Sequence, residues 1–318
     1  MNAIEHRTVI VNGLPTHLAE SGSGPLVILL HGFPELWYSW RHQLPALAAA
    51  GYHAVAPDLR GHGRTAAPPD AADYGMAAYV DDVLGLLDVL GESTAVLVGH
   101  DWGMRTAWAA AESHPARFPA IVALSVPHQA RTPAPPTEQL RAWARDRLNW
   151  MLYFQEPVAD SDLSADVART LRLMLYGLSG DAGELGVRLL TTLPADAVLL
   201  DEIPEPPGPL PWLSDADLSY YVSEYQRTGF RGGLNRYRNA DRDWHRLPTL
   251  GTGVLPQPTL FAGGAYDTAV RFNDLSAMRT LVPNLHEPMV IPGCGHWIQQ
   301  ERPDEINEAV LAFLDKVG

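Results

Sequence analysis

The chain has 318 residues, of which 46% are hydrophobic and 19% are charged, so it can form a sizeable buried core. Its 37 acidic and 23 basic residues give a formal charge of −14. A surface this acidic repels phosphate backbones and anionic lipid heads, so we expect the protein to bind neither nucleic acid nor a membrane.

Before Arg131, short β-rich runs alternate with helical patterns. The first two predicted strands, Thr8–Val11 and His17–Ser21, flank Asn12-Gly13, a dipeptide typical of hairpin turns. The strands expected next are Pro25–Leu30, Ala54–Pro57, Ala95–Val98 and Ala120–Val126, and the helices are Leu44–Gly51, Tyr79–Gly91 and Met104–His114. This alternation predicts an α/β protein whose mostly parallel sheet has helices on both faces.

The rest of the chain divides at proline-rich stretches, which favour loops or linkers: Arg131–Thr137, Ile203–Trp212 and Leu247–Pro258. Between the first and third stretches the predicted elements are helices: Leu140–Phe154, Asp166–Tyr176 and Asp217–Thr228. Afterwards come two strands, Thr259–Ala262 and Glu287–Ile291, and a closing helix, Ile306–Val317. We therefore predict a core of residues 1–130 and 249–318. A helical cap of residues 131–248 is expected over the carboxyl ends of the strands, where open α/β sheets bind ligands.

The strongest motif is Gly99-His100-Asp101-Trp102-Gly103, between a predicted strand and a predicted helix. It has the layout of a nucleophile elbow, in which small flanking residues allow a strained turn that lifts the central side chain above the sheet edge. Unsatisfied N–H groups at the start of the helix favour negative charge on Asp101. We therefore predict that Asp101 is a catalytic nucleophile, although the motif alone also fits an aspartate that only caps the helix.

His31–Glu35 (HGFPE) directly follows the predicted strand Pro25–Leu30. In folds that carry a nucleophile elbow, the loop at this place supplies a second backbone N–H group to the oxyanion hole. We therefore expect the N–H groups of Phe33 and Trp102 to form the oxyanion hole. The tight turn also favours a cis Phe33–Pro34 bond.

Two further residues complete a possible catalytic triad with Asp101. His296 lies in a glycine-rich loop (PGCGHW) after the last predicted strand, and Asp267 follows the strand before it. The order nucleophile, acid, histidine is the chain order of this fold. The other place for the acid follows the strand that ends near Val126, where the chain has no carboxylate. We expect His296 to activate water and Asp267 to orient it, while a loop-capping carboxylate is the alternative role for Asp267.

Together these strings resemble the epoxide hydrolases of the α/β-hydrolase fold. The similarity runs through core and cap and includes HGFPE, GHDWG, LYFQEP (152–157), GFRGGLNRYRN (229–239), the Asp267 loop and GHWIQQE (295–301). The resemblance implies an α/β-hydrolase core with an inserted cap. It also implies an enzyme that converts an epoxide and water to a vicinal diol through a covalent ester on Asp101.

The resemblance further implies that two cap tyrosines, Tyr153 and Tyr237, bind and protonate the epoxide oxygen. With Phe33 and Trp102 they are the expected substrate contacts. One position departs from the family, because the residue before the second tyrosine is often Trp and is Arg236 here. A charged residue at this position either alters the pocket wall or points to solvent, and the sequence leaves both open.

The residue types also indicate the substrate. An aspartate that attacks a saturated carbon forms a stable alkyl ester, so Asp101 favours epoxides or haloalkanes over carboxylic esters. An opening epoxide generates an alkoxide that needs a proton, which Tyr153 and Tyr237 can supply, whereas a halide needs none. The alternatives are a haloalkane or haloacid dehalogenase, for which Arg105 is the nearby cation, and a non-catalytic ligand-binding protein of the same fold.

Neither a metal nor an organic cofactor is expected, because the chain has no H-E-x-x-H motif and its one cysteine, Cys294, cannot form a paired thiolate site. The N-terminal residues lack the apolar stretch of a signal peptide. The longest aliphatic run near the start, Leu26–Leu30, is far shorter than the roughly 20 residues that span a membrane. We therefore expect a cytoplasmic enzyme with a small-molecule epoxide as partner, either a monomer or a homodimer.

Overall fold

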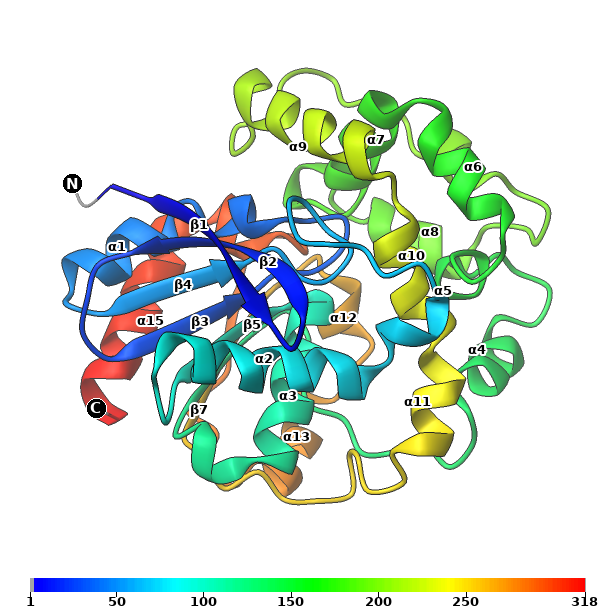
Figure 1. Cartoon of the computed structure of the whole chain (residues 1–318). Coiled ribbons are helices and arrows are strands. Elements are labelled where there is room, and N and C mark those ends of the chain that lie inside the picture. The colour runs from blue at the N-terminus through cyan, green and yellow to red at the C-terminus, as the bar shows by residue number, and fades with distance from the viewer. Residues whose placement is uncertain (1–2, 318) are drawn as a thin grey trace.

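The computed structural model describes residues 3–317, which form one twisted sheet with helices on both faces and a group of helices beyond one end (Figure 1). Within these residues the sheet has eight strands in the order β1-β2-β4-β3-β5-β6-β7-β8. The strands are β1 (Glu5–Val11), β2 (Leu14–Ser21), β3 (Leu26–Leu30), β4 (His53–Pro57), β5 (Val96–His100), β6 (Ile121–Leu124), β7 (Thr259–Gly264) and β8 (Met289–Ile291). β1 and β2 form an antiparallel hairpin, β2 is antiparallel to β4, and every pair from β4 to β8 is parallel. The predicted α/β class is confirmed.

The hairpin forms at the predicted turn. Asn12 has φ 49° and Gly13 has φ 83°, the left-handed geometry that a two-residue hairpin turn requires. β3 shows why the parallel strands are continuous apolar runs, since both of its faces are buried. Ile28 packs into the core layer on one face of the sheet, whereas Val27 and Leu29 pack into the layer on the other face.

Helices cover both of these layers. The helices along the chain are α1 (Gln43–Ala49), α2 (Met76–Leu90), α3 (Asp101–Ser113), α4 (Pro136–Ala144), α5 (Trp150–Tyr153), α6 (Val158–Ala165), α7 (Val167–Gly177), α8 (Leu185–Thr191), α9 (Asp215–Thr228), α10 (Arg231–Arg238), α11 (Ala240–Arg246), α12 (Thr268–Arg271), α13 (Leu275–Leu281), α14 (Ile298–Glu301) and α15 (Pro303–Val317). Short 3₁₀ turns lie at Trp37–Trp40, Ala71–Tyr74, Pro115–Arg117, Gly180–Ala182 and Leu199–Glu202. α2, α3 and α13 contribute to one layer, and α1 and α15 to the other.

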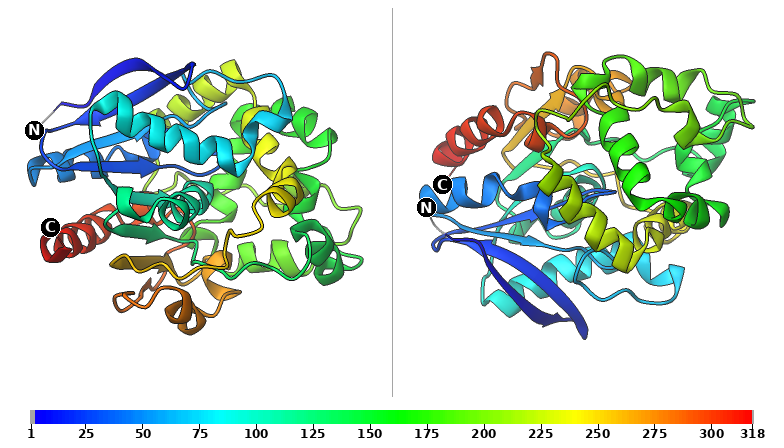
Figure 2. Two further views of the ribbon diagram at one scale, coloured as in Figure 1. Left: turned by 60° about the horizontal axis from the view of Figure 1, so that its bottom comes forward. Right: turned by 90° about the horizontal axis from the view of Figure 1, so that it is seen from above.

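The helices α4–α11 lie between β6 and β7 in the chain and gather at one end of the sheet (Figures 1 and 2). They have an apolar cluster of their own, to which α7 gives Leu171 and α9 gives Tyr221. The same cluster includes Phe33 and Trp297, which follow β3 and β8. These helices therefore pack on loops at the carboxyl ends of the parallel strands. The exact cap boundaries, 131 and 248, stay a prediction.

One predicted helix is wrong. Leu140–Phe154 is divided into α4 and α5. The chain leaves α4 at Arg145, whose φ of 55° cannot continue a right-handed helix. α5 then starts afresh at Asn149, whose side chain accepts hydrogen bonds from the N–H groups of Met151 and Leu152. Hydrophobic spacing alone does not reveal such a break.

No helix within residues 3–317 has both the length and the apolar character needed to cross a membrane.

Candidate active site

Asp101 is the first residue of α3 and directly follows β5, in the left-handed region at φ 50°. Neighbouring glycines make this turn possible. A Cβ on Gly99 would lie 2.7 Å from Met104 Cα, and one on Gly32 would lie 2.4 Å from Asp101 Cβ. The backbone at the carboxyl ends of β3 and β5 can therefore approach closely, which is the strained geometry of a nucleophile elbow.

The Asp101 carboxylate faces the residues that the sequence analysis associated with it. The Phe33 backbone N–H donates to Asp101 Oδ1 at 3.0 Å, and His296 Nε2 lies 3.7 Å from Oδ2. Burial opposes the charge on Asp101, but His296 and the Trp102 backbone N–H outweigh burial and hold its pKa at about 2. The side chain keeps 20% of its surface accessible, so it is an ionised group that a small molecule can reach. The Phe33–Pro34 bond is cis, as predicted.

His296 and Asp267 form an ion pair. His296 Nδ1 lies 3.1 Å from Asp267 Oδ2, and Asp267 is buried. Asp267 also caps α12, because its Oδ1 accepts the Ala269 N–H at 2.8 Å. Burial favours neutral imidazole, but the charges of Asp267 and Asp101 hold the pKa of His296 well above its ordinary value. The structure thus brings Asp101, His296 and Asp267 into one line of contacts, with His296 in the middle.

The loop that carries His296 is held by a residue that the sequence analysis did not single out. Glu301 accepts hydrogen bonds from the N–H groups of Gly180, Gly295 and Trp297, at 2.8, 2.9 and 3.0 Å. Its three backbone partners include both neighbours of His296, so Glu301 limits the movement of the loop. The only sequence signal was its place at the end of the GHWIQQE string.

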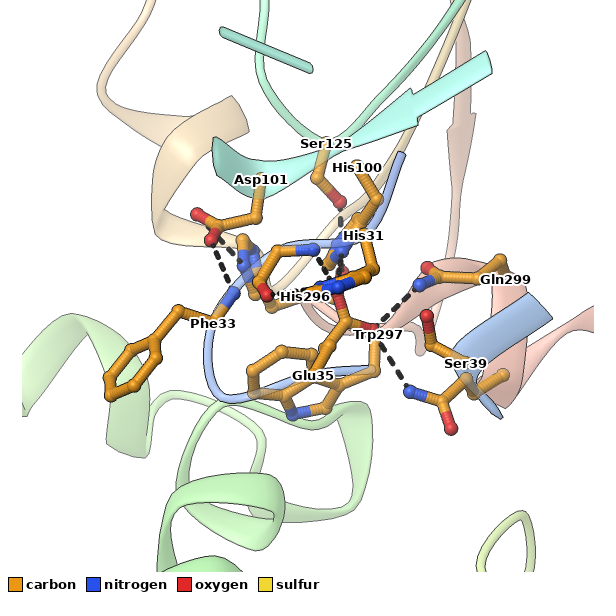
Figure 3. A network of polar contacts seen from close by, with 12 residues as sticks. His31, Phe33, Glu35, Ser39, His100, Asp101, Ser125, His296, Trp297 and Gln299 are labelled. Atoms are coloured by element: carbon orange, nitrogen blue, oxygen red, sulfur yellow. Dashed lines mark hydrogen bonds and ion pairs between the residues drawn. The ribbon is translucent and has the colours of Figure 1, made fainter. Parts of the chain in front are cut away.

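A second network, shown in Figure 3, joins the His296 loop to the loop after β3. Glu35 Oε2 accepts from the Gly32 N–H at 2.8 Å and contacts His100 Nδ1 at 2.6 Å. The other ring nitrogen of His100 contacts the His296 backbone oxygen at 2.7 Å, and that oxygen also accepts from Ser125. Although burial opposes it, His100 lowers the pKa of Glu35, so the carboxyl is ionised. Glu35 and His100 therefore tie the loop after β3 to the loop that carries His296.

The two predicted tyrosines lie differently. Tyr237 is a buried residue of α10, and its ring meets those of Trp102 and Phe33 edge-on, with centroids 4.9 and 5.8 Å away. Tyr153, the last residue of α5, is half-buried and donates its hydroxyl proton to Asp162 Oδ2 at 2.7 Å. Tyr237 thus packs on the residues beside Asp101, whereas the Tyr153 hydroxyl is engaged within the cap.

Both phenols are held in the protonated form. Burial raises the pKa of Tyr237 well above its ordinary value, and the charge of Asp101 raises it further. Burial and Asp162 raise the pKa of Tyr153 as well. Phe154 lies between the two rings, at 5.7 Å from Tyr153 and 5.1 Å from Tyr237. Both hydroxyls are therefore proton donors at neutral pH, carried by one aromatic cluster.

Arg236 does not point to solvent. Its side chain is buried, with Cζ 4.2 Å from the centroid of the Tyr79 ring and 5.0 Å from that of Trp102. The nearest carboxylate, on Asp243, lies 3.8 Å away. Arg236 therefore supports the indole of Trp102 through cation–π contact.

Within residues 3–317, no group of three or more His, Cys, Asp or Glu side chains is arranged to hold a metal ion.

The chain is similar to known proteins over nearly its whole length. Residues 25–303 match the family model described as the alpha/beta hydrolase fold. The chain is 42% identical to Epoxide hydrolase A of Mycobacterium tuberculosis, over 99% of this chain and 98% of that protein. It is 39% identical to Epoxide hydrolase 2 of Siraitia grosvenorii, over 99% of this chain and all of that protein.

Solved structures agree with this similarity. The crystal structure of Epoxide Hydrolase A from Mycobacterium thermoresistibile superposes with a TM-score of 0.94 at 42% identity, and 99% of each chain is covered. An epoxide hydrolase from an endophytic Streptomyces superposes with a TM-score of 0.93 at 46% identity, over 98% of this chain and 95% of the other.

Proposed function

Because this chain belongs to the epoxide hydrolases of the α/β-hydrolase fold, we propose that it opens its substrate through a covalent ester on Asp101 and releases a vicinal diol. The observation that carries this mechanism is the position of one ionised carboxylate. Asp101 contacts the Phe33 N–H group on one oxygen and faces His296 from the other. A nucleophile, an oxyanion donor and a base thus meet at one carboxyl group.

The first step is attack on the ring. An oxygen of Asp101 bonds to a ring carbon while the bond from that carbon to the epoxide oxygen breaks. The departing alkoxide takes a proton from a phenol, for which Tyr237 is supported by its contact with Trp102. For Tyr153 to share this task, its hydroxyl must exchange Asp162 for the substrate oxygen, because a hydroxyl has one proton to donate.

Ester formation also prepares the base for the second step. In the free enzyme the carboxylates of Asp101 and Asp267 favour protonated His296. Once Asp101 is esterified, one of these charges is gone, and the pKa of His296 falls. Its proton can then restore the phenol that lost one, and neutral His296 is ready to accept a proton from water.

The second step is hydrolysis of the ester. Water attacks the carboxyl carbon of Asp101 as His296 takes its proton, and the Phe33 and Trp102 N–H groups stabilise the tetrahedral oxyanion. The bond from the carboxyl carbon to the alkyl oxygen then breaks as the proton left on the attacking oxygen passes to the alkyl oxygen, and the diol leaves. One water is consumed, while Asp101 returns as a carboxylate and His296 as an imidazolium. We propose that residues 131–248 act as the cap that brings the tyrosines to this site.

The test is a single turnover in ¹⁸O-labelled water with enzyme in excess over a neutral epoxide such as styrene oxide. The covalent route predicts that the first diol carries unlabelled oxygen from Asp101 and that the label enters the Asp101 carboxylate. Label in the first-turnover diol would contradict the ester. Halide release from a haloalkane or haloacid, without diol formation from epoxides, would instead favour dehalogenation.

A further inference from the structure

Arg105 lies near Asp101, and the proposed mechanism gives it no role. It lies four residues after Asp101 on α3, so the two side chains leave the same face of the helix one turn apart. Its guanidinium carbon is 5.3 Å from the centroid of the Trp102 ring. Arg105 is exposed, and within the described part of the chain its side chain makes no hydrogen bond and no ion pair.

The electrostatic environment of Arg105 shows which charged group lies near it. Burial lowers the pKa of Arg105, while the negative charge of Asp101 raises it. The guanidinium is thus close enough to Asp101 for the carboxylate charge to act on it, and both residues lie on the same face of α3. The carboxylate of Asp101 keeps accessible surface, and Trp102, whose ring Arg105 contacts, is partly exposed.

Arg236 is a useful internal comparison, because both arginines contact the ring of Trp102. Arg236 is closed off from solvent, and a carboxylate lies 3.8 Å away, on Asp243. Arg105 contacts the indole, but no anionic side chain among the described residues pairs with it. A guanidinium is stabilised by a carboxylate that accepts two parallel N–H bonds, so Arg105 is complementary to an anion that residues 3–317 do not supply.

We propose that Arg105 binds a carboxylate of the substrate, so that the preferred substrates are epoxides with a carboxylate a few bonds from the ring. This inference rests on the proposed function of Asp101. Four residues of helix span about 6 Å, which suits a carboxylate on the ring or one or two carbons away. The cation also offsets the repulsion that an anionic substrate meets near the Asp101 carboxylate.

Binding tests the proposal without any turnover. The probes are trans-cinnamate and its neutral amide, neither of which has an epoxide, and calorimetry gives the dissociation constants. We expect the wild type to bind the carboxylate about 10- to 100-fold more tightly than the amide, and Arg105→Gln to lose this preference. Arg279→Gln, which removes the same charge from an exposed pair with Glu287, should keep it. Equal affinity of the wild type for both probes would overturn the proposal.

Kinetics separates this proposal from the mechanism. The substrates are trans-3-phenylglycidate, its neutral methyl ester and styrene oxide. Arg105→Gln should lower kcat/KM for the carboxylate about 10- to 100-fold and leave both neutral epoxides near wild-type values, with Arg105→Lys in between. An equal loss on all three substrates would overturn the proposal, because Arg105 would then act on Asp101. If the wild type hydrolyses none of them, the proposed function fails, while the cinnamate measurement still decides the role of Arg105.

Discussion

The two sides of the site are held in different ways. On the core side, Asp101, His296 and Asp267 follow strands. The loops that carry them are fixed by carboxylates, such as Glu301, which accepts hydrogen bonds from three backbone N–H groups. On the cap side, Tyr237 is positioned by ring contacts, and Tyr153 by its ring contact with Phe154 and a hydroxyl bond to Asp162. In the proposed mechanism, the charges that form and break the ester are therefore preorganised, whereas Tyr153 must change its hydrogen-bond partner before it can donate to substrate.

The largest effect should come from the core side. With His296→Gln, Asp101 can still be alkylated, but water is no longer activated, so kcat should fall by about 10²- to 10⁴-fold. Intact-protein mass should rise by one substrate as the ester accumulates. A variant that binds substrate but shows no adduct would rule out His296 as the base of the second step.

The coupling between Asp101 and His296 can be measured directly. In Asp101→Asn one of the two charges that raise the pKa of His296 is lost, so the imidazolium should lose its proton at lower pH than in the wild type. Removing a neighbouring anion can only disfavour the cation, which gives the sign. NMR titration of the His296 ring is the measurement, and an unchanged or higher pKa would show that Asp101 does not control the base.

The tyrosines should differ from each other. Tyr237→Phe removes the phenol packed against Trp102 and should lower kcat/KM by about 10²-fold. Tyr153→Phe should lower kcat/KM by only about tenfold. The Tyr153 hydroxyl must give up its bond to Asp162 to reach the substrate, so the net free energy gained from the new hydrogen bond is smaller. Steady-state kinetics with styrene oxide compares them. Equal losses would remove the distinction between the two donors, and wild-type activity of the double variant would exclude both.

The smallest effect concerns Asp162. In Asp162→Ala the competing acceptor is gone, so Tyr153 can donate to substrate without exchanging partners. KM for styrene oxide should fall by about fivefold. The same substitution in a Tyr153→Phe background should change nothing. A higher KM in Asp162→Ala would mean that Asp162 positions Tyr153 instead of competing for its proton.

Prediction from the sequence succeeded where the determinants are local. β3 and β5 were expected within two residues of their ends, because uninterrupted apolar runs that end at Leu30 and Val98 mark buried strands. The cap was harder, since helices as short as α5 and α6 bury few residues and show little periodicity. The break between α4 and α5 depends on the backbone of Arg145 and the side chain of Asn149, which compete with a continuous apolar face.

The roles of Asp101, His296 and Asp267 stay predictions that the geometry supports, and they came from short motifs whose turns need particular residue types. The supports of the site could not be inferred in this way. Glu301 reaches back to Gly180, and Glu35 reaches His100, across long stretches of chain. Such contacts exist only after the cap and the core have packed.

Short stretches of sequence were thus sufficient for the strand–helix alternation, the strained turn at Asp101 and the chemistry its carboxylate favours, because periodicity and turn sterics act over a few residues. Three-dimensional packing alone decided that Arg236 is buried against Trp102, that Tyr153 bonds to Asp162 and that no carboxylate within residues 3–317 pairs with Arg105. Those outcomes depend on which distant side chains share a confined space, and no pattern along a single stretch of chain specifies that.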